Sequence, residues 1–245
     1  MDRINGYVYH MVHFRNLENI FLRRAILSKE MVKKEAIGYQ SIACEEVQNL
    51  RDRIFVWDFS KQRYLRLHSY VPFYFTGRTP MLHVQYRQGI QQEIVIFEVS
   101  RSILKDQGVL FTDGNASNQQ LSKSGGEKVG IRPATISDGL CHREYRPGGR
   151  PLGKNTSCSN FYADVIFLEH LNWGLINDQH TIEDTKERTR IKHAEVLVPD
   201  LLPLGRILGI SVNTQDMVQA VNAAISECGL AGRIPLARCK PSLFF

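Results

Sequence analysis

The segment that decides the fold reads Ser69-Tyr-Val-Pro-Phe-Tyr-Phe75, followed directly by Thr76-Gly-Arg-Thr-Pro-Met-Leu82. Its first half is aromatic and β-branched, which predicts a strand. Pro72 cannot donate a ladder hydrogen bond, so we expect an edge strand or a bulge there. Residues 76–80 are typical of a turn, and residues 81–86 predict a short helix.

Other strands and helices are expected on both sides of this segment. β-branched and apolar residues favour strands over residues 6–12, 94–99, 194–198 and 206–212. Helical spacing predicts a short helix after Asn16 as N-cap, one over residues 45–54, and a longer one that Thr214 caps. Strands and helices do not alternate as in βαβ units, so the expected fold class is α+β.

The whole chain, residues 1–245, is expected to form a single domain. Eight of its 18 glycines lie between Thr112 and Asn160. We therefore expect an irregular basic insertion at about residues 116–160, either functional or poorly ordered. Its basic residues include Arg143, Arg146, Arg150 and Lys154. Residues 28–42 predict a polar connection.

The chain carries an excess of positive charge. Its 31 Lys and Arg residues against 25 Asp and Glu residues give a net charge of +6, and the isoelectric point is about 9.1. This excess favours polyanionic partners such as nucleic acid. A basic protein without such a partner is the alternative that charge alone leaves open.

Several classes of protein are disfavoured. The five cysteines contain no CxxC pair, so we expect a reducing, cytoplasmic location and no disulfide framework. No apolar run approaches the roughly 20 residues of a membrane span, and the start of the chain resembles no signal peptide. Cys141, His142 and Cys158 match no usual zinc spacing, so no metal is expected. No phosphate-binding loop, HExxH motif or GxSxG motif is present.

Glu195 is the sharpest candidate for chemistry. It lies inside the apolar segment Ala194-Glu-Val-Leu-Val198, after a charged run over residues 183–193. Strand alternation places Ala194, Val196 and Val198 on one face and Glu195 with Leu197 on the other. Periodicity alone favours a solvated carboxylate on a half-exposed strand. The alternative is a carboxylate held in a cleft, where it can act on a sugar or a proton.

Three other features allow two interpretations each. Arg51 and Arg53, in the second expected helix, are either surface residues or serve as an anion clamp or a charge partner in an active site. His10, in the first expected strand, is either a core histidine or part of a site. The aromatic residues of the segment 70–75 either fill the core or supply stacking surfaces for a nicotinamide ring or a splayed base.

These segments occur in an order that resembles the DarT family of toxins, which ADP-ribosylate DNA bases and are paired with a macrodomain antitoxin. The resemblance runs across nearly the whole chain and is weakest in the 116–160 insertion. It rests on five motifs: Tyr9-His-Met-Val-His-Phe-Arg-Asn-Leu17, Val47-Gln-Asn-Leu-Arg-Asp-Arg53, Tyr70 to Leu82, Phe111-Thr-Asp-Gly-Asn-Ala116 and His193-Ala-Glu-Val-Leu-Val198.

The resemblance implies an ADP-ribosyltransferase fold, with two small β-sheets around an NAD cleft and flanking helices. It implies that Glu195 and Arg51 are catalytic. The cofactor contacts it implies are His10, Met11, Asn16, Arg51, Tyr74 and Phe75. The nucleic-acid contacts it implies are Arg53, Arg78, Lys192 and His193, with the charged run as the loop that presents the target.

The resemblance therefore predicts a toxin-type enzyme that uses NAD as substrate, attaches ADP-ribose to a base of single-stranded DNA, and releases nicotinamide. Thymine and guanine both remain open as the target base. A macrodomain antitoxin is the expected protein partner. The alternatives are the same fold acting on RNA or protein, a silent nucleic-acid-binding module, and a plain NAD glycohydrolase.

Overall fold

The structure of the protein is a computed structural model that describes residues 3–119, 121, 126–146, 158–178 and 185–245. The helices are α1 (Leu17–Arg23), α2 (Lys29–Lys34), α3 (Glu45–Arg51), α4 (Pro80–Arg87), α5 (Trp173–Asn177), α6 (Lys186–Lys192) and α7 (Gln215–Glu227). The strands are β1 (Tyr7–His13), β2 (Ala25–Leu27), β3 (Ile54–Asp58), β4 (Arg63–Arg66), β5 (Tyr70–Tyr74), β6 (Ile94–Ser100), β7 (Leu110–Thr112), β8 (Lys128–Arg132), β9 (His142–Arg146), β10 (Phe161–Tyr162), β11 (Glu195–Pro199), β12 (Leu201–Pro203), β13 (Ile207–Val212) and β14 (Ala237–Cys239).

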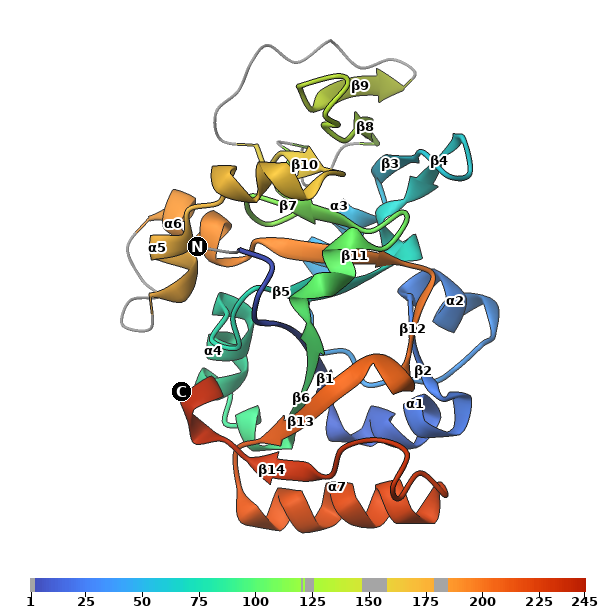
Figure 1. The fold of residues 1–245 in the computed structure, drawn as a ribbon, viewed down its shortest axis with the longest axis vertical. Helices are drawn as coiled ribbons and strands as arrows, with labels where there is room; N and C mark the ends of the chain where they lie inside the picture. Colours follow the sequence, from blue (N-terminus) through green and yellow to red (C-terminus); the bar gives the residue numbers. More distant parts are fainter. Residues whose placement is uncertain (1–2, 120, 122–125, 147–157, 179–184) are drawn as a thin grey trace.

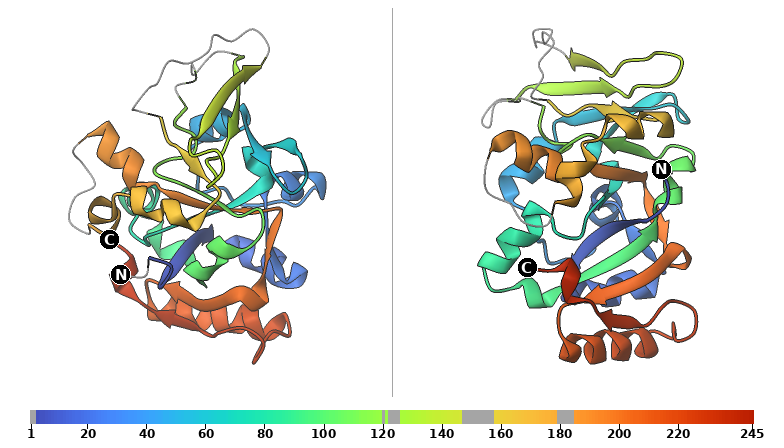
Figure 2. Two further views of the ribbon diagram at one scale, coloured as in Figure 1. Left: turned by 45° about the horizontal axis from the view of Figure 1, so that its top comes forward. Right: turned by 60° about the vertical axis from the view of Figure 1, so that its left-hand side comes forward.

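The strands form three sheets, and the predicted α+β class is confirmed. The largest sheet has eight strands in the order β10-β7-β11-β5-β1-β6-β13-β14, the second has the order β4-β3-β8-β9, and the third pairs β12 with β2. The sheet arrangement is thus one large sheet and two small ones. In Figure 1, α7 covers the β13–β14 end of the molecule, and the four-stranded sheet lies at the opposite end. The two further views in Figure 2 show the same arrangement.

The prediction that Pro72 marks an edge strand is wrong. β5 lies between β11 and β1, and Pro72 is in register with Leu197 of β11. β1 pairs with β5 through Tyr9 and Tyr74 alone. The Pro72 carbonyl bonds the His10 ring from β1, and backbone N and O of one strand residue point the same way. The missing N–H of Pro72 therefore faces a part of β1 that makes no ladder bond to it.

Two segments are more regular than their composition predicts. Within the 116–160 segment, β8 pairs in parallel with β3, and β9 pairs antiparallel with β8. Arg143 donates hydrogen bonds to Gln119 and to the Ser159 carbonyl. Arg150 and Lys154 lie outside the described residues. The expected polar connection at 28–42 contains α2, whose N-cap Ser28 accepts a hydrogen bond from the Met31 N–H.

The hydrophobic core follows the predicted alternation. Val196 and Val198 belong to one buried cluster, and Leu197 belongs to a second cluster on the other face of β11. α7 starts at the predicted cap, because the Thr214 side chain accepts from the Met217 N–H. No helix in the described part of the chain has the length and apolar character that crossing a membrane requires.

Candidate active site

A cavity of about 830 Å³ opens beside the N-terminal end of β11. Its wall is formed by residues from β1, α1, β2, α2, residues 37–44, α3, β5 and α4, together with Asn115, Thr189, His193 and Glu195. The residues predicted to act in the site that line this cavity are His10, Met11, Asn16, Arg51, Tyr74, His193 and Glu195. Segments from most of the length of the chain therefore meet at one place.

A buried ion pair lies on the cavity wall. The Arg51 guanidinium donates from Nη1 to both carboxylate oxygens of Glu195, at 2.9 and 3.1 Å. Arg51 is 6% exposed and Glu195 is 1% exposed. The interpretation of Glu195 as a solvated surface carboxylate is therefore wrong. Strand alternation places its side chain on the same face of β11 as Leu197, and the surrounding chain covers it.

The backbone around Glu195 fixes the carboxylate from two directions. The Ala116 N–H donates to Oε1 at 3.0 Å, so the carboxylate accepts from the loop that follows β7 as well as from α3. The Glu195 N–H donates to the Thr112 hydroxyl, which in turn donates to the Gly114 carbonyl. Thr112 thus connects the strand that carries Glu195 to the loop that bonds its side chain.

The loop over residues 113–116 is itself held by a buried network. Arg190 of α6 donates to the Asp113 carboxylate at 3.0 Å, and the Arg190 carbonyl accepts from the Asn115 N–H at 2.9 Å. Asn160 also donates to Asp113 from its backbone N–H. Asn115 lines the cavity. The charged run at 186–192 is therefore a helix whose Arg190 supports the site from behind.

His10 presents a neutral ring to the cavity. Its Nδ1 lies 2.7 Å from the Pro72 carbonyl, which can only accept, so Nδ1 carries the hydrogen. Burial lowers the pKa of His10 to about 4. At neutral pH the Nε2 atom therefore has a free lone pair and can accept a hydrogen bond, for example from a hydroxyl group.

Asn16 acts on the cavity through a neighbouring loop. It occupies the N-cap position of α1, as predicted, but its side chain makes no capping bond. Instead, Nδ2 donates to the Gln40 carbonyl and Oδ1 accepts from the Gln40 N–H, at 2.9 and 2.7 Å. These two bonds hold residues 37–44 against the cavity. Tyr39 in this loop is 47% exposed and lines the cavity, so it offers an aromatic ring at the rim.

Tyr74 and His193 form an aromatic wall beside Glu195. Their ring centroids are 6.2 Å apart with an edge-on geometry. Burial, with a smaller contribution from the charge of Glu195, raises the pKa of Tyr74, so its hydroxyl stays protonated. Burial lowers the pKa of His193, so that ring stays neutral at pH 7. Of the described residues that line the cavity, Arg51 is the charged residue that forms an ion pair with the Glu195 carboxylate.

Comparison with known proteins assigns this arrangement to a family. The family model described as ssDNA thymidine ADP-ribosyltransferase, DarT, matches residues 9–132 and 153–245. The chain belongs to the DarT family. The unmatched stretch, residues 133–152, lies in the segment where the resemblance of motifs is weakest.

Two curated relatives match part of the chain. A DNA ADP-ribosyl transferase of Thermus aquaticus is 29% identical over 121 residues, and a DNA ADP-ribosyl transferase-DNA ADP-ribosyl glycohydrolase fusion protein of Thermosipho africanus is 28% identical over 120 residues. Each match covers 46% of this chain, and the matches span 52% and 28% of the relatives. The chain thus aligns with about half or less of each relative.

Solved structures share the fold over the full chain. Thermus sp. 2.9 DarT in complex with ADP-ribosylated ssDNA has a TM-score of 0.73 at 22% identity, covering 98% of this chain and 96% of that one. The same Thermus protein in complex with NAD+ has a TM-score of 0.71 at 21% identity, covering 100% and 99%. At this level of identity the comparison establishes the ADP-ribosyltransferase fold of the family.

Four of the predicted contacts do not line the cavity. Phe75 is buried in the core against Trp173 and Phe111. Arg78 donates to the Phe244 carbonyl and lies over the Phe245 ring. Lys192 is 2% exposed and donates to the Asp178 carbonyl. Arg53 follows α3, and its carbonyl accepts from the Val129 N–H of β8.

Sequence reasoning missed two parts of the site. Asn115 and Ala116 belong to the motif Phe111–Ala116, but their residue types do not indicate that a backbone N–H of this segment bonds Glu195. Tyr39 and Gln40 lie in a segment without periodicity. The signal that was available for them is an aromatic residue in an otherwise polar connection just before α3.

The packing around Gly114 gives a test of how the loop is held. A Cβ added at Gly114 would approach Arg190 closely and would lie 2.9 Å from the Ser159 hydroxyl. We expect Gly114→Ala to cost about 1–3 kcal/mol of unfolding free energy in urea. It should also speed hydrogen exchange at the Ala116 amide. Gly205→Ala is the control, because nothing lies within 4 Å of its added Cβ. Equal stability of the two variants would contradict the close packing at Gly114.

Two buried histidines give the stability a defined pH dependence. Burial lowers the pKa of His10 to about 4, and burial together with the charge of Arg51 lowers the pKa of His68 to about 4. Between pH 6.5 and pH 4 the unfolded chain binds protons that the folded chain does not, so stability falls as the pH falls through this window. Urea unfolding should show this decline, and it should be shallower in a His10→Gln, His68→Gln variant. Identical pH slopes for the two proteins would contradict the lowered values.

Proposed function

We propose that the chain is a toxin-type ADP-ribosyltransferase that uses NAD as substrate, attaches ADP-ribose to a base of single-stranded DNA, and releases nicotinamide. The observation that carries the proposal is the buried Arg51–Glu195 pair on the wall of a cavity of about 830 Å³. The family description names thymidine, which supports thymine as the target base.

Glu195 would stabilise the positive charge that develops on the ribose as the bond to nicotinamide breaks. A preorganised carboxylate is effective in this role because it needs no rearrangement when the charge appears. Bonds from Arg51 and from the Ala116 N–H hold the Glu195 carboxylate in place. Its position at the first residue of β11 makes the support rigid.

The acceptor nitrogen of the base loses a proton as it bonds to C1′ of the ribose. Glu195, or a water that it holds, is the group that takes this proton. Arg51 acts electrostatically, since a guanidinium remains protonated and cannot serve as a base. Arg51 would orient Glu195 and stabilise the negative charge that the base develops.

The remaining walls of the cavity suit a dinucleotide. His10 offers the neutral Nε2 acceptor to a ribose hydroxyl, and Asn16 holds the loop that closes one side. Met11 and Tyr74 supply apolar surface for the nicotinamide ring. A cavity of this size lies within the range that ligands of drug size or larger occupy.

The DNA base must be unpaired to reach the cavity, so single-stranded DNA fits the geometry best. Tyr39 at the rim offers a surface on which a base can stack. Of the four predicted nucleic-acid contacts, His193 lines the cavity. We propose Arg53, which follows α3, as a further phosphate contact. Arg78 donates to the Phe244 carbonyl and Lys192 to the Asp178 carbonyl.

The proposed activity implies a partner protein that removes ADP-ribose from the modified DNA. The Thermosipho africanus relative is a fusion of a DNA ADP-ribosyl transferase with a DNA ADP-ribosyl glycohydrolase. We propose that this chain acts in the cytoplasm as the toxin of a pair whose second member is a macrodomain hydrolase. The net charge of +6 supports a nucleic-acid substrate over a plain NAD glycohydrolase.

The activity is tested with NAD and single-stranded oligonucleotides that each contain one thymine or one guanine in an adenine background. We expect the thymine oligonucleotide to gain the mass of one ADP-ribosyl group. If only the guanine oligonucleotide is modified, the target base is guanine and the proposed reaction still stands. NAD hydrolysis without any modified DNA would contradict DNA modification and favour a glycohydrolase. ADP-ribosylation of RNA or protein in place of DNA would show that the substrate belongs to a different class.

The role of Glu195 is tested by Glu195→Gln, which keeps the size of the side chain and removes its charge. We expect the rate of transfer to fall roughly 100-fold or more. Glu98→Gln is the matched control, because Glu98 of β6 is also a buried carboxylate in an ion pair, with Lys240, and is not among the residues that line the cavity. Comparable rates in the Glu195→Gln and Glu98→Gln proteins would remove Glu195 from the chemistry.

A further inference from the structure

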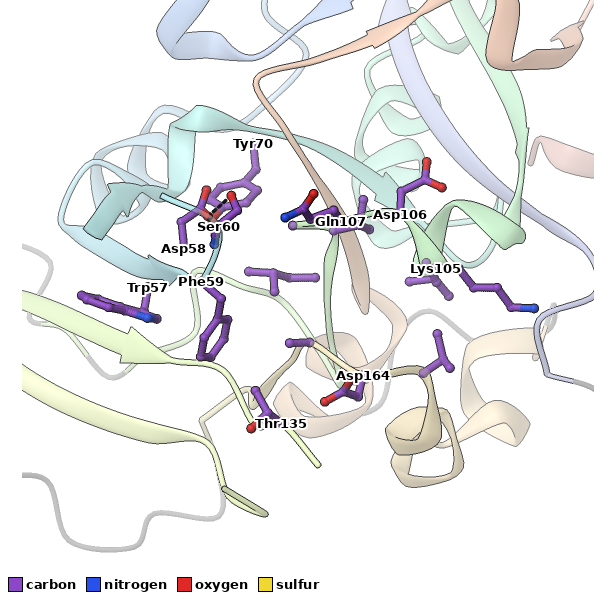
Figure 3. Close-up of a pocket in the computed structure, with 16 residues that line it drawn as sticks. Trp57, Asp58, Phe59, Ser60, Tyr70, Lys105, Asp106, Gln107, Thr135 and Asp164 are labelled. Carbon is purple, nitrogen blue, oxygen red and sulfur yellow. Dashed lines mark hydrogen bonds between the residues drawn. The ribbon is translucent and has the colours of Figure 1, made fainter. Parts of the chain in front are cut away.

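A second cavity, of about 550 Å³, lies between the four-stranded sheet and the segment that links β6 to β7. Figure 3 shows Asp58, Ser60 and Tyr70 grouped on one side of it, Lys105 and Asp106 on the other, and Thr135 and Asp164 below. It shares no lining residue with the cavity that holds Glu195. Tyr70 and Tyr74 are the two end residues of β5, so the two cavities lie at opposite ends of that strand, about 13 Å apart along it.

Two buried polar atoms on this wall, Asp58 Oδ2 and the Tyr70 hydroxyl, make no hydrogen bond within the described residues. Asp58 is 3% exposed and Tyr70 is 1% exposed. A buried polar atom without a partner is costly, and a group of them on one cavity wall is a feature that a ligand can explain.

The geometry of Asp58 leaves one oxygen for such a ligand. Its Oδ1 atom accepts from the Ser60 N–H, the Ser60 hydroxyl and the Lys61 N–H, at 2.8, 2.6 and 3.0 Å. Burial acts to raise the pKa of Asp58, but these bonds outweigh it and hold the pKa below its usual range. The carboxylate is therefore ionised and fixed, with Oδ2 as a strong acceptor.

The neighbouring Tyr70 hydroxyl is a donor. Burial and the charge of Asp58 raise the pKa of Tyr70, so its hydroxyl keeps its hydrogen. A matching ligand must therefore present an N–H group and an acceptor on the same side of one molecule.

The rest of the wall narrows the class of ligand. Trp57, Phe59 and Tyr70 supply aromatic surface, which favours a flat ring. Asp58, Asp106 and Asp164 disfavour a bare anion inside the cavity. Lys105, which lines the cavity, is exposed and carries a positive charge at the rim. A phosphate attached to the ring can lie there.

We propose that this second cavity binds a nucleobase, with its N–H edge on Asp58 Oδ2, its acceptor on the Tyr70 hydroxyl and its phosphate near Lys105. The base can come from a nucleotide of a bound DNA strand, which rests on the proposed function, or from a free nucleotide, which does not. Both sources share one chemistry, and the distance between the cavities suits a strand of a few nucleotides.

Trp57 reports on this cavity directly. Trp173→Phe leaves it as the single tryptophan of the chain, because the sequence holds two. We expect the four deoxynucleoside monophosphates, or single-stranded tetranucleotides, to quench its fluorescence in the absence of NAD, and inorganic phosphate to leave it unchanged. Quenching by the monophosphates assigns a free nucleotide as ligand, and quenching by the tetranucleotides alone assigns a DNA strand.

Two substitutions test the contacts. Tyr70→Phe removes only the hydroxyl, and Asp58→Asn keeps the Oδ1 acceptor while replacing Oδ2 with a donor. Each should weaken binding about tenfold or more. Tyr7→Phe, at an exposed site on β1, should leave affinity unchanged. Tyr70→Phe should melt at the same temperature as the parent or higher, because it removes a buried hydroxyl without a partner.

The proposal is overturned if no nucleotide or oligonucleotide quenches Trp57, if Tyr70→Phe and Asp58→Asn bind as tightly as the parent, or if Tyr70→Phe melts at a lower temperature. The last result would show that the hydroxyl is part of a structural water site. Binding is measured without NAD and in the Glu195→Gln background. Its outcome is therefore separate from whether the protein modifies DNA.

Discussion

The ion pair between Arg51 and Glu195 is the constraint on which the rest of the site depends. Removing two charges from water costs several kcal/mol for each ion, and only good geometry and further hydrogen bonds offset that cost. Both are present here, because Arg51 bonds both carboxylate oxygens and the Ala116 N–H adds a third bond. The pair joins the end of α3 to the start of β11, across 144 positions of sequence.

The residues around this ion pair are neutral or paired elsewhere. Within the described lining of the cavity, His10 and His193 are neutral at pH 7 because burial lowers their pKa values. The Asp113 carboxylate beside the same loop is already paired with Arg190. The Glu195 carboxylate therefore has Arg51 as its one ion-pair partner among the described residues.

Local patterns predicted the elements of the fold, and tertiary contacts decided the rest. Strand alternation correctly separated Val196 from Leu197, yet it could not show that α3 and the 113–116 loop cover Glu195. Pro72 was assigned to an edge because composition does not show how neighbouring strands diverge. Tyr39 lies on the cavity in a loop that distant side chains hold, among them Asn16, 23 positions earlier, which bonds the adjacent Gln40. The order of the motifs, and not their periodicity, predicted that Arg51, His10 and Glu195 belong to one site.

The most direct measurement is a double-mutant cycle on the rate of ADP-ribosyl transfer to a thymine oligonucleotide. It uses the parent, Arg51→Gln, Glu195→Gln and the double variant, each shown to be folded. If the two side chains act as one catalytic unit, the double variant should be no slower than the slower single variant. Strictly additive losses would contradict a joint role and would show that Arg51 and Glu195 contribute independently.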